Sequence, residues 1–179
     1  MGIPEENIDR LLQPVLSHQP DGQGDEMEKK SILVVDDDET VLNLLSGTLK
    51  REGYSVDTAI TGNEAIEKSN SRFYNLALID VRLPDIEGTR LLTDMRETTP
   101  RMAKIIITGY PSLENAVESA NKHADGYLIK PVDIDELLNR IRICLKRQEE
   151  AAEYYEQKVK EFIERRARKE GSRSGNAYS

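Results

Sequence analysis

Five short apolar runs alternate with segments of helical periodicity between residues 31 and 146, and this alternation constrains the fold more than any other feature. The runs are Ile32–Val35, Tyr54–Ala59, Leu76–Ile79, Ile105–Ile107 and Tyr127–Ile129. Strands that alternate with helices form a parallel sheet covered on both faces and joined by right-handed crossovers. We therefore predict a doubly wound α/β domain over residues 31–146.

The segments between these runs carry helix-boundary signals. Thr61 and Glu64 have the spacing of a capping box, and Ser112 is placed to cap the helix that follows it. The last helix is expected to begin near Asp133, and no clear stop signal appears before Gly171.

Charge and composition narrow the classes of function. Residues 31–145 carry a net charge of −6, which argues against a domain that grips nucleic acid directly. Cys144 is the only cysteine, so no intrachain disulfide can form, and this fits a reducing compartment. No stretch approaches the roughly 18 apolar residues of a membrane span. We expect a cytoplasmic protein that does not enter the membrane.

Polar residues stand at the carboxyl ends of four of the five runs. Asp36 and Asp37 follow the first run, Asp80 the third, Thr108 the fourth and Lys130 the fifth. The carboxyl ends of parallel strands share one edge of the sheet, and ligands bind at that edge in open doubly wound folds. The five side chains are therefore expected to meet in one cleft.

Three carboxylates in one cleft repel one another, which would raise their pKa values. Lys130 supplies one positive charge, so a hard divalent cation such as Mg²⁺ is expected beside Asp36, Asp37 and Asp80. A carboxylate beside Mg²⁺, a lysine and a hydroxyl is a poor general base. It is a good nucleophile toward phosphorus, because the cations stabilise charge on the phosphoryl oxygens. The product of such an attack is an acyl phosphate.

Four motifs lie at these strand ends: ILVVDDD from residue 32, LIDVRLP from residue 78, IITG from residue 106 and YLIKP from residue 127. Together, in this order and at these intervals, they resemble the receiver domain of response regulators. The resemblance covers about residues 31–146, roughly two thirds of the chain. It implies a flavodoxin-like, five-stranded parallel sheet of strand order 2-1-3-4-5, followed here by a long C-terminal helical extension.

The resemblance also implies a role for each residue of the cleft. Asp80 would accept a phosphoryl group from the phosphohistidine of a sensor histidine kinase. Asp37 would bind Mg²⁺ directly, Asp36 directly or through water, and the backbone carbonyl of Arg82 would be a further ligand. Lys130 would pair with the phosphoryl oxygens, and its bond to the following proline would be cis. Such a protein is a phosphoacceptor that assists its own phosphorylation and dephosphorylation, not an enzyme.

Two further residues would form the switch, and three would tune it. Thr108 would donate its hydroxyl to the phosphoryl group and move toward it, and Tyr127 would turn inward when Thr108 moves. Gly109 would leave backbone access to the site. Arg82 and Tyr110 lie two residues after the phosphoacceptor and two after Thr108, where side chains influence hydrolysis in this family. Both are large, which predicts slow autodephosphorylation.

The segments outside the domain carry weaker signals. Residues 1–30 indicate a mostly flexible leader and linker, in which Met27 could be the original start. A 3,4-residue spacing links Leu138, Ile141, Leu145, Gln148, Ala152, Tyr155, Val159 and Phe162. Residues 147–170 are therefore expected to extend the last helix, either as a coiled-coil homodimer or as a charged helix that is solvated or folded back. Residues 171–179 indicate disorder.

Several functions remain open at this point. Taken singly, each cleft residue has an ordinary explanation, such as an acidic helix start, a loop acid, a surface lysine or a packed tyrosine. Together they favour a stand-alone response regulator whose phosphorylation switches oligomerisation or binding of a protein that the sequence does not name. The alternatives are a transcription regulator with Arg165, Arg166, Arg168 and Lys169 on DNA, a phosphorelay intermediate, and a phosphatase of the haloacid dehalogenase type built on Asp36 and Asp38.

Overall fold

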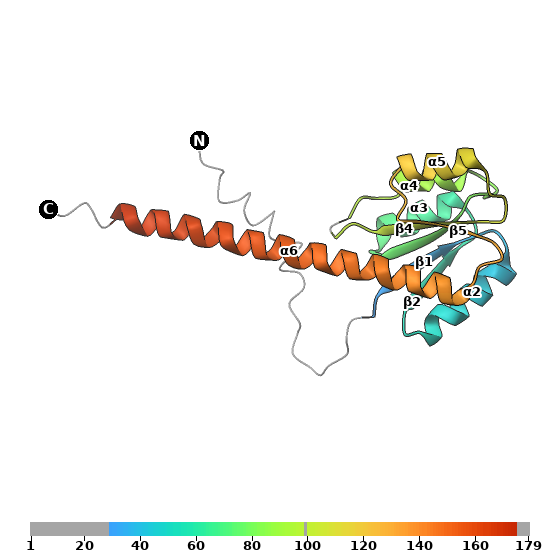
Figure 1. The fold of residues 1–179 in the computed structure, drawn as a ribbon, viewed down its shortest axis with the longest axis horizontal. Helices are drawn as coiled ribbons and strands as arrows, with labels where there is room; N and C mark the ends of the chain where they lie inside the picture. The colour runs from blue at the N-terminus through green and yellow to red at the C-terminus, as the bar shows by residue number, and fades with distance from the viewer. Residues whose placement is uncertain (1–28, 99, 175–179) are drawn as a thin grey trace. The chain divides into compact units, whose positions relative to one another are not determined.

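Five parallel strands form one sheet of order β2-β1-β3-β4-β5 in the computed structural model, which describes residues 29–98 and 100–174 (Figure 1). The strands are β1 Ser31–Val35, β2 Ser55–Ala59, β3 Leu76–Asp80, β4 Ala103–Thr108 and β5 Gly126–Ile129. All four pairings are parallel. This confirms the predicted flavodoxin-like sheet. The leader expected over residues 1–30 lies almost wholly outside the described residues.

The connections are helical, and the predicted caps are in place. The helices are α2 Glu39–Arg51, α3 Gly62–Ser71, the 3₁₀ turn η1 Gly88–Arg90, α4 Leu91–Asp94, α5 Leu113–Asn121 and α6 Ile134–Ser174. Thr61 Oγ1 accepts the backbone N–H of Glu64 at 3.1 Å, and Ser112 Oγ accepts that of Asn115 at 3.0 Å. The Glu64 carboxylate reaches back to the N–H of Ile60, one residue before the cap.

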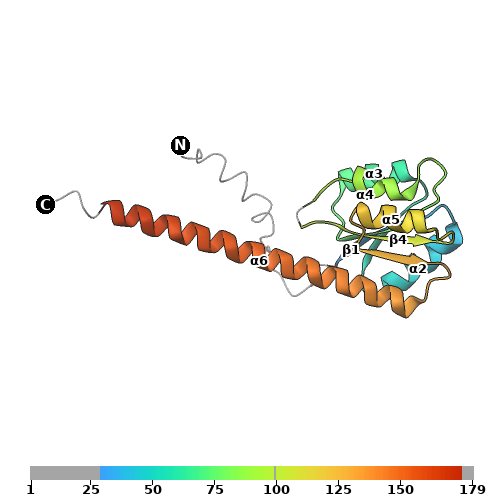
Figure 2. The same ribbon diagram turned by 45° about the horizontal axis from the view of Figure 1, so that its top comes forward.

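Helices cover both faces of the sheet, so the central strands are buried on both sides (Figures 1 and 2). Ile32 and Val34 of β1 point into a core shared with α2 and with the first turns of α6. Leu33 and Val35 point into a second core shared with α3 and α4. Successive residues of a strand face opposite sides, which explains why these strands are continuously apolar in the sequence.

The helix α6 is divided between two compact units. The first unit ends at Gln148, and the second contains the residues from Glu149 onward. In the first unit Gln148 is only 8% exposed, and its side-chain amide is fully used. Its Nε2 donates to the carbonyls of Asn75 at 3.0 Å and Arg101 at 2.6 Å, and its Oε1 accepts from Asn75 Nδ2 at 3.1 Å. The first part of the heptad stripe, Leu138, Ile141, Leu145 and Gln148, is therefore buried in this unit.

Two boundaries differ from the sequence-based expectation. The compact unit includes α6 through Gln148 instead of ending at residue 146, because the buried amide joins the helix to the start of β3 and β4. The helix also continues through Gly171 to Ser174, where disorder was expected from residue 171. One glycine lowers helix stability by about 1 kcal/mol but removes no backbone hydrogen bond, so it need not end a helix. Residues 175–179 lie outside the described part.

Candidate functional site

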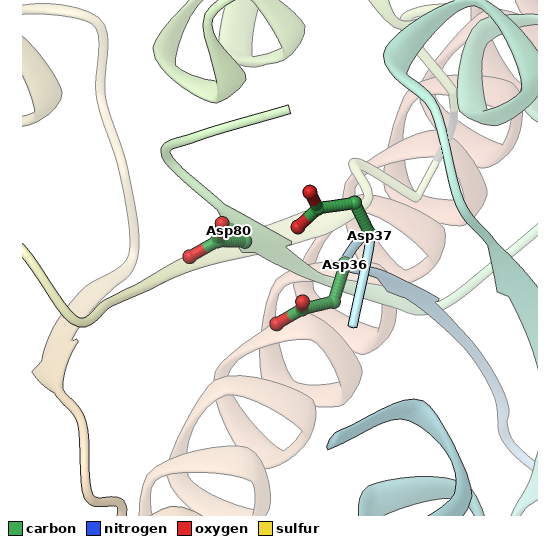
Figure 3. Close-up of side chains that lie close together, drawn as sticks. All are labelled: Asp36, Asp37 and Asp80. Carbon is green, nitrogen blue, oxygen red and sulfur yellow. The ribbon is translucent and has the colours of Figure 1, made fainter. Parts of the chain in front are cut away.

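The carboxyl edge of the sheet brings the predicted polar residues together. Asp36 follows β1 directly, Asp80 is the last residue of β3, Thr108 is the last residue of β4, and Lys130 follows β5. Figure 3 shows Asp36 and Asp37 at the end of β1 and Asp80 at the end of β3. One carboxylate oxygen from each of these three lies within 4.8 Å of the others. The topology therefore builds the acidic pocket from segments 43 positions apart in the sequence.

A single lysine is shared between the two buried carboxylates. Lys130 Nζ lies 2.6 Å from Asp36 Oδ2 and 3.2 Å from Asp80 Oδ1. Burial lowers the pKa of Lys130, but the hydrogen bonds and charges of the two carboxylates outweigh burial and raise this pKa above its ordinary value. Burial raises the pKa of Asp80, and the charge of Asp36 adds to this effect, while Lys130 opposes it. The ammonium of Lys130 has two carboxylate partners, whereas the two carboxylates have only this one ammonium between them.

The remaining oxygens of the buried carboxylates accept backbone N–H groups. The N–H of Asp38 donates to Asp36 Oδ1 at 2.9 Å, and that of Arg82 donates to Asp80 Oδ2 at 3.1 Å. Asp36 and Asp80 are 3% and 7% exposed, while Asp37 faces solvent. With Lys130 the pocket carries two more negative than positive charges. Such an oxygen-rich, under-neutralised donor set fits a hard divalent cation.

Thr108 ends β4 at the carboxyl edge of the sheet, whereas Tyr127 lies earlier in its own strand, β5. Thr108 is fully buried, and its hydroxyl oxygen accepts the backbone N–H of Tyr110 at 3.1 Å, which leaves the hydroxyl hydrogen free to donate elsewhere. The ring of Tyr127 packs against the core shared with α3 and α4. Its hydroxyl is buried and has no hydrogen-bond partner among the described residues. Most buried side-chain hydroxyls in proteins have a hydrogen-bond partner, so the environment of Tyr127 is uncommon.

The two predicted tuning side chains contact each other. The guanidinium carbon of Arg82 lies 3.5 Å from the ring centroid of Tyr110, a cation–π stack. Arg82 belongs to the loop after Asp80, and Tyr110 to the loop after Thr108. The stack therefore joins the two loops that follow these strand ends. The sequence spacing identified both residues but not their contact.

Asp85 is a residue of this edge that the sequence analysis missed. Its carboxylate accepts the backbone N–H groups of Asn63 at 2.8 Å and Gly62 at 2.9 Å, at the start of α3. These hydrogen bonds, with that of Asn63 foremost, hold the pKa of Asp85 below its ordinary value although burial opposes them. Asp85 thereby fastens the loop after β3 to α3. The Pro84-Asp85 pair signals a turn, but nothing local predicts a partner 22 residues away.

Gly88 is the second missed residue. A Cβ at this position would fall 1.8 Å from the carbonyl oxygen of Asp80, so only glycine fits against the strand end. The N–H of Gly88 donates to the carbonyl of Val81 at 2.7 Å and closes the loop. At Gly109, in contrast, a Cβ would meet only the stem of Lys130 at 3.7 Å, an ordinary contact. The bond between Lys130 and the following proline is cis, as expected.

Comparison with known proteins agrees with this geometry. A protein-family model described as the response regulator receiver domain matches residues 32–142. The chain belongs to this family. As a receiver it is a phosphoacceptor signalling module and not a classical enzyme, and membership implies a cognate histidine kinase. The pocket of Asp36, Asp37 and Asp80 is consistent with the metal-binding site of receivers.

Individual relatives match about two thirds of this chain. The response regulator ArlR of Staphylococcus aureus is 38% identical over 119 residues, which are 65% of this chain and 53% of ArlR. The chain thus spans about half the length of the curated relatives it matches. A CheY-like receiver domain protein from Methanospirillum hungatei JF-1 is 45% identical with a TM-score of 0.66, over 69% of this chain and 99% of that one.

A third relative contains a phosphorylated aspartic acid. A response regulator from Burkholderia pseudomallei, solved with a phosphorylated aspartic acid, a calcium ion and citrate, is 28% identical with a TM-score of 0.57. The match covers 69% of this chain and 74% of that one. Within residues 29–98 and 100–174, no helix combines the length and apolarity needed to cross a membrane.

Proposed function

We propose that Asp80 accepts a phosphoryl group from a phosphohistidine of a sensor histidine kinase, in a Mg²⁺-dependent reaction in the cytoplasm. The observation that carries the proposal is the buried Asp80 carboxylate, 3.2 Å from the ammonium of Lys130 and within one cluster with Asp36 and Asp37. A bond forms between an Asp80 oxygen and phosphorus as the phosphorus–nitrogen bond of the donor breaks. The electron pair of that bond stays on the imidazole nitrogen.

The excess negative charge of the pocket supports the metal requirement. Asp36, Asp37, Asp80 and the backbone carbonyl of Arg82 would hold Mg²⁺, whose oxygen preference suits them. When bound, the cation supplies positive charge near the phosphoryl oxygens. Lys130 then has a second task, because its ammonium can pair with a phosphoryl oxygen instead of being divided between two carboxylates.

Thr108 and Tyr127 supply the conformational response in this proposal. The hydroxyl of Thr108 already accepts the N–H of Tyr110, so it can donate its hydrogen to a phosphoryl oxygen. Movement of Thr108 toward that oxygen frees space for the ring of Tyr127. The hydroxyl of Tyr127 has no hydrogen-bond partner among the described residues, so the ring breaks no such bond when it moves. The output is altered binding of a protein partner or self-association through α6, whose residues Tyr155 and Phe162 are exposed.

The test is incubation of the full chain with acetyl phosphate and Mg²⁺, followed by intact-mass measurement. The wild type should gain one phosphoryl group, and a chelator should prevent the gain. Asp80→Asn should gain none, because an amide oxygen is a far weaker nucleophile than a carboxylate. Asp135→Asn, which changes an exposed acid at the start of α6, is the matched control and should label like the wild type. Full labelling of Asp80→Asn would overturn the proposal.

The stack of Arg82 on Tyr110 predicts the lifetime of the phosphorylated form. Two large side chains in contact shield an acyl phosphate on Asp80 from water, so the double variant Arg82→Ala/Tyr110→Ala should lose its label several-fold faster. Because the two act as one unit, each single variant should account for most of the change. Arg90→Ala, an exposed arginine outside the two loops, serves as control. Unchanged decay in the double variant would rule out this shielding.

A further inference from the structure

The loop of residues 81–88 follows β3 and carries the backbone carbonyl of Arg82, the expected metal ligand. Its two ends are held beside the strand end. The N–H of Gly88 donates to the carbonyl of Val81 at 2.7 Å, and the N–H of Arg82 donates to Asp80 Oδ2 at 3.1 Å. These hydrogen bonds close the loop, but they do not involve its central residues.

The central residues of this loop are held by the start of α3. Asp85 Oδ1 accepts the N–H of Gly62 at 2.9 Å, and Asp85 Oδ2 accepts that of Asn63 at 2.8 Å. The next residue, Ile86, lies so close to Gly62 that a Cβ added there would overlap the Ile86 side chain. We call these interactions, of Asp85 and Ile86 with Gly62 and Asn63, the loop–α3 contact.

The loop–α3 contact depends on a carboxylate in particular. The first N–H groups of a helix have no partner inside the helix. Within α3, Thr61 Oγ1 accepts the N–H of Glu64, and the N–H groups of the two residues between them are left to Asp85. A carboxylate offers one oxygen to each and brings negative charge to the positive end of the helix. An amide has only one oxygen, so asparagine at this position can keep only part of the contact.

We propose that Asp85 is a positioning residue for the metal site: by holding the centre of the loop on α3, it places the carbonyl of Arg82 and raises the affinity of the pocket for Mg²⁺. The inference rests on the proposed function, which counts this carbonyl among the ligands. A ligand that is already fixed in place loses less conformational freedom when the cation binds. Groups that orient metal ligands change metal affinity by about 10–100-fold, and a single carbonyl among several ligands belongs at the lower end of this range.

The coupling between the loop–α3 contact and the cation is reciprocal. If the contact raises the affinity for Mg²⁺ by some factor, then bound Mg²⁺ must stabilise the contact by the same factor. The N–H groups of Gly62 and Asn63 therefore report on the cation although they do not bind it. The start of α3 responds to Mg²⁺ before any phosphoryl group is transferred.

The first test is calorimetric titration of the full chain with Mg²⁺ and no phosphodonor. Asp85→Ala should raise the Kd about tenfold, and Asp85→Asn about threefold because one acceptor oxygen remains. Glu87→Gln is the matched control, since it removes one exposed carboxylate from the same loop and its side chain caps no helix N–H. This control should bind like the wild type, and circular dichroism should show all three variants folded at the temperature of the titration.

The outcomes of this titration separate the inference from the proposed function. A Kd for Asp85→Ala within twofold of the wild-type value would overturn the positioning role and leave the Mg²⁺ requirement intact. An equal rise in Kd for Glu87→Gln would also overturn it, because the effect would then come from charge alone. A wild type that binds no Mg²⁺ would instead contradict the metal requirement of the proposed function.

A second test separates positioning from general structural support. In Asp85→Ala, half-maximal labelling by acetyl phosphate should need about tenfold more Mg²⁺, but the rate at saturating Mg²⁺ should equal that of the wild type. A lower maximal rate with an unchanged Mg²⁺ requirement would assign Asp85 a structural role only. In the wild type, Mg²⁺ should slow hydrogen exchange at the amides of Gly62 and Asn63 by a factor similar to the change in Kd. Exchange that does not respond to Mg²⁺ would contradict the coupling.

Discussion

The two edges of the sheet hold two polar clusters of opposite design. At the carboxyl edge Asp36, Asp80 and Lys130 are charged, and one ammonium serves two buried carboxylates. At the amino edge Asn75 and Gln148 are neutral. The Asn75 side-chain oxygen accepts the backbone N–H of Ser31 at 2.8 Å, and its amide nitrogen donates to Gln148 at 3.1 Å. Asp36, Asp80 and Gln148 are all buried, but only the first cluster holds unbalanced charge.

The charged cluster has the character of a binding site, whereas the neutral cluster only connects α6 to the sheet. A buried amide that makes all its hydrogen bonds ties α6 to the strands and holds it in one place. A buried carboxylate with too little positive charge nearby has a raised pKa and a standing affinity for a cation. A carboxylate whose pKa is shifted by burial and by neighbouring charges is a candidate for a functional site. The same fold therefore joins its elements through neutral hydrogen bonds at one edge and holds unbalanced charge at the other.

Lys130→Met should produce the largest effect, because among the described residues Lys130 is the cation whose ammonium pairs with both Asp36 and Asp80. Breaking a buried ion pair at one partner destabilises a protein by about 3–5 kcal/mol, and here two carboxylates lose the same lysine. Urea unfolding in a chelator should show this loss, and Mg²⁺ should restore part of it.

Lys160→Met is the control for this substitution, since its ammonium contacts Glu156 at 2.9 Å on the exposed surface of α6. Exposed pairs contribute about 0–1 kcal/mol, so the control should unfold close to the wild type. Equal unfolding free energies of the two variants would mean that Asp36 and Asp80 do not need the ammonium of Lys130 for the fold to be stable.

Gln148→Ala should have the next largest effect and acts on the neutral edge. It removes the Gln148 partner of the Arg101 carbonyl and of the Asn75 side-chain amide, while the Asn75 carbonyl keeps the N–H of Ala103, at a cost of about 2–3 kcal/mol once water has relaxed around them. Gln157→Ala, an exposed glutamine of the same helix, should change the unfolding free energy by less than about 0.5 kcal/mol. Labelling of Asp80 should persist in both variants. A loss of labelling in Gln148→Ala would show that the two edges are not independent.

Asp85→Asn should give the smallest effect, visible in the pH dependence of stability. Because the folded pKa of Asp85 lies below its ordinary value, its stabilising contribution is present above the unfolded pKa of about 3.9 and is lost as pH falls through the folded pKa. The wild type should therefore exceed Asp85→Asn in stability near neutral pH, and the gap should narrow below about pH 4. A gap that stays constant with pH would contradict the role of the charged carboxylate. Asp135→Asn should show no such trend.

Much of the cleft follows from the sequence, because its signals are local. Strands are short apolar runs, and a parallel sheet places all their carboxyl ends at one edge, so Asp36, Asp80, Thr108 and Lys130 could be grouped without coordinates. The contacts of Asp85 and Gln148 could not be predicted from the sequence. Their partners lie 22 and 73 residues away, and no motif in the sequence links them. Such pairs depend on how whole elements pack.

The heptad stripe of α6 shows the same division most plainly. By itself the sequence determined a long helix with one apolar stripe, because a 3,4 spacing places those side chains on one face of any α-helix. Only the tertiary structure decided that the first part of this stripe, Leu138, Ile141 and Leu145, packs into the receiver core. The later residues Tyr155 and Phe162 are exposed. Periodicity reports which face of a helix is apolar, and the packing of the other elements decides what covers it.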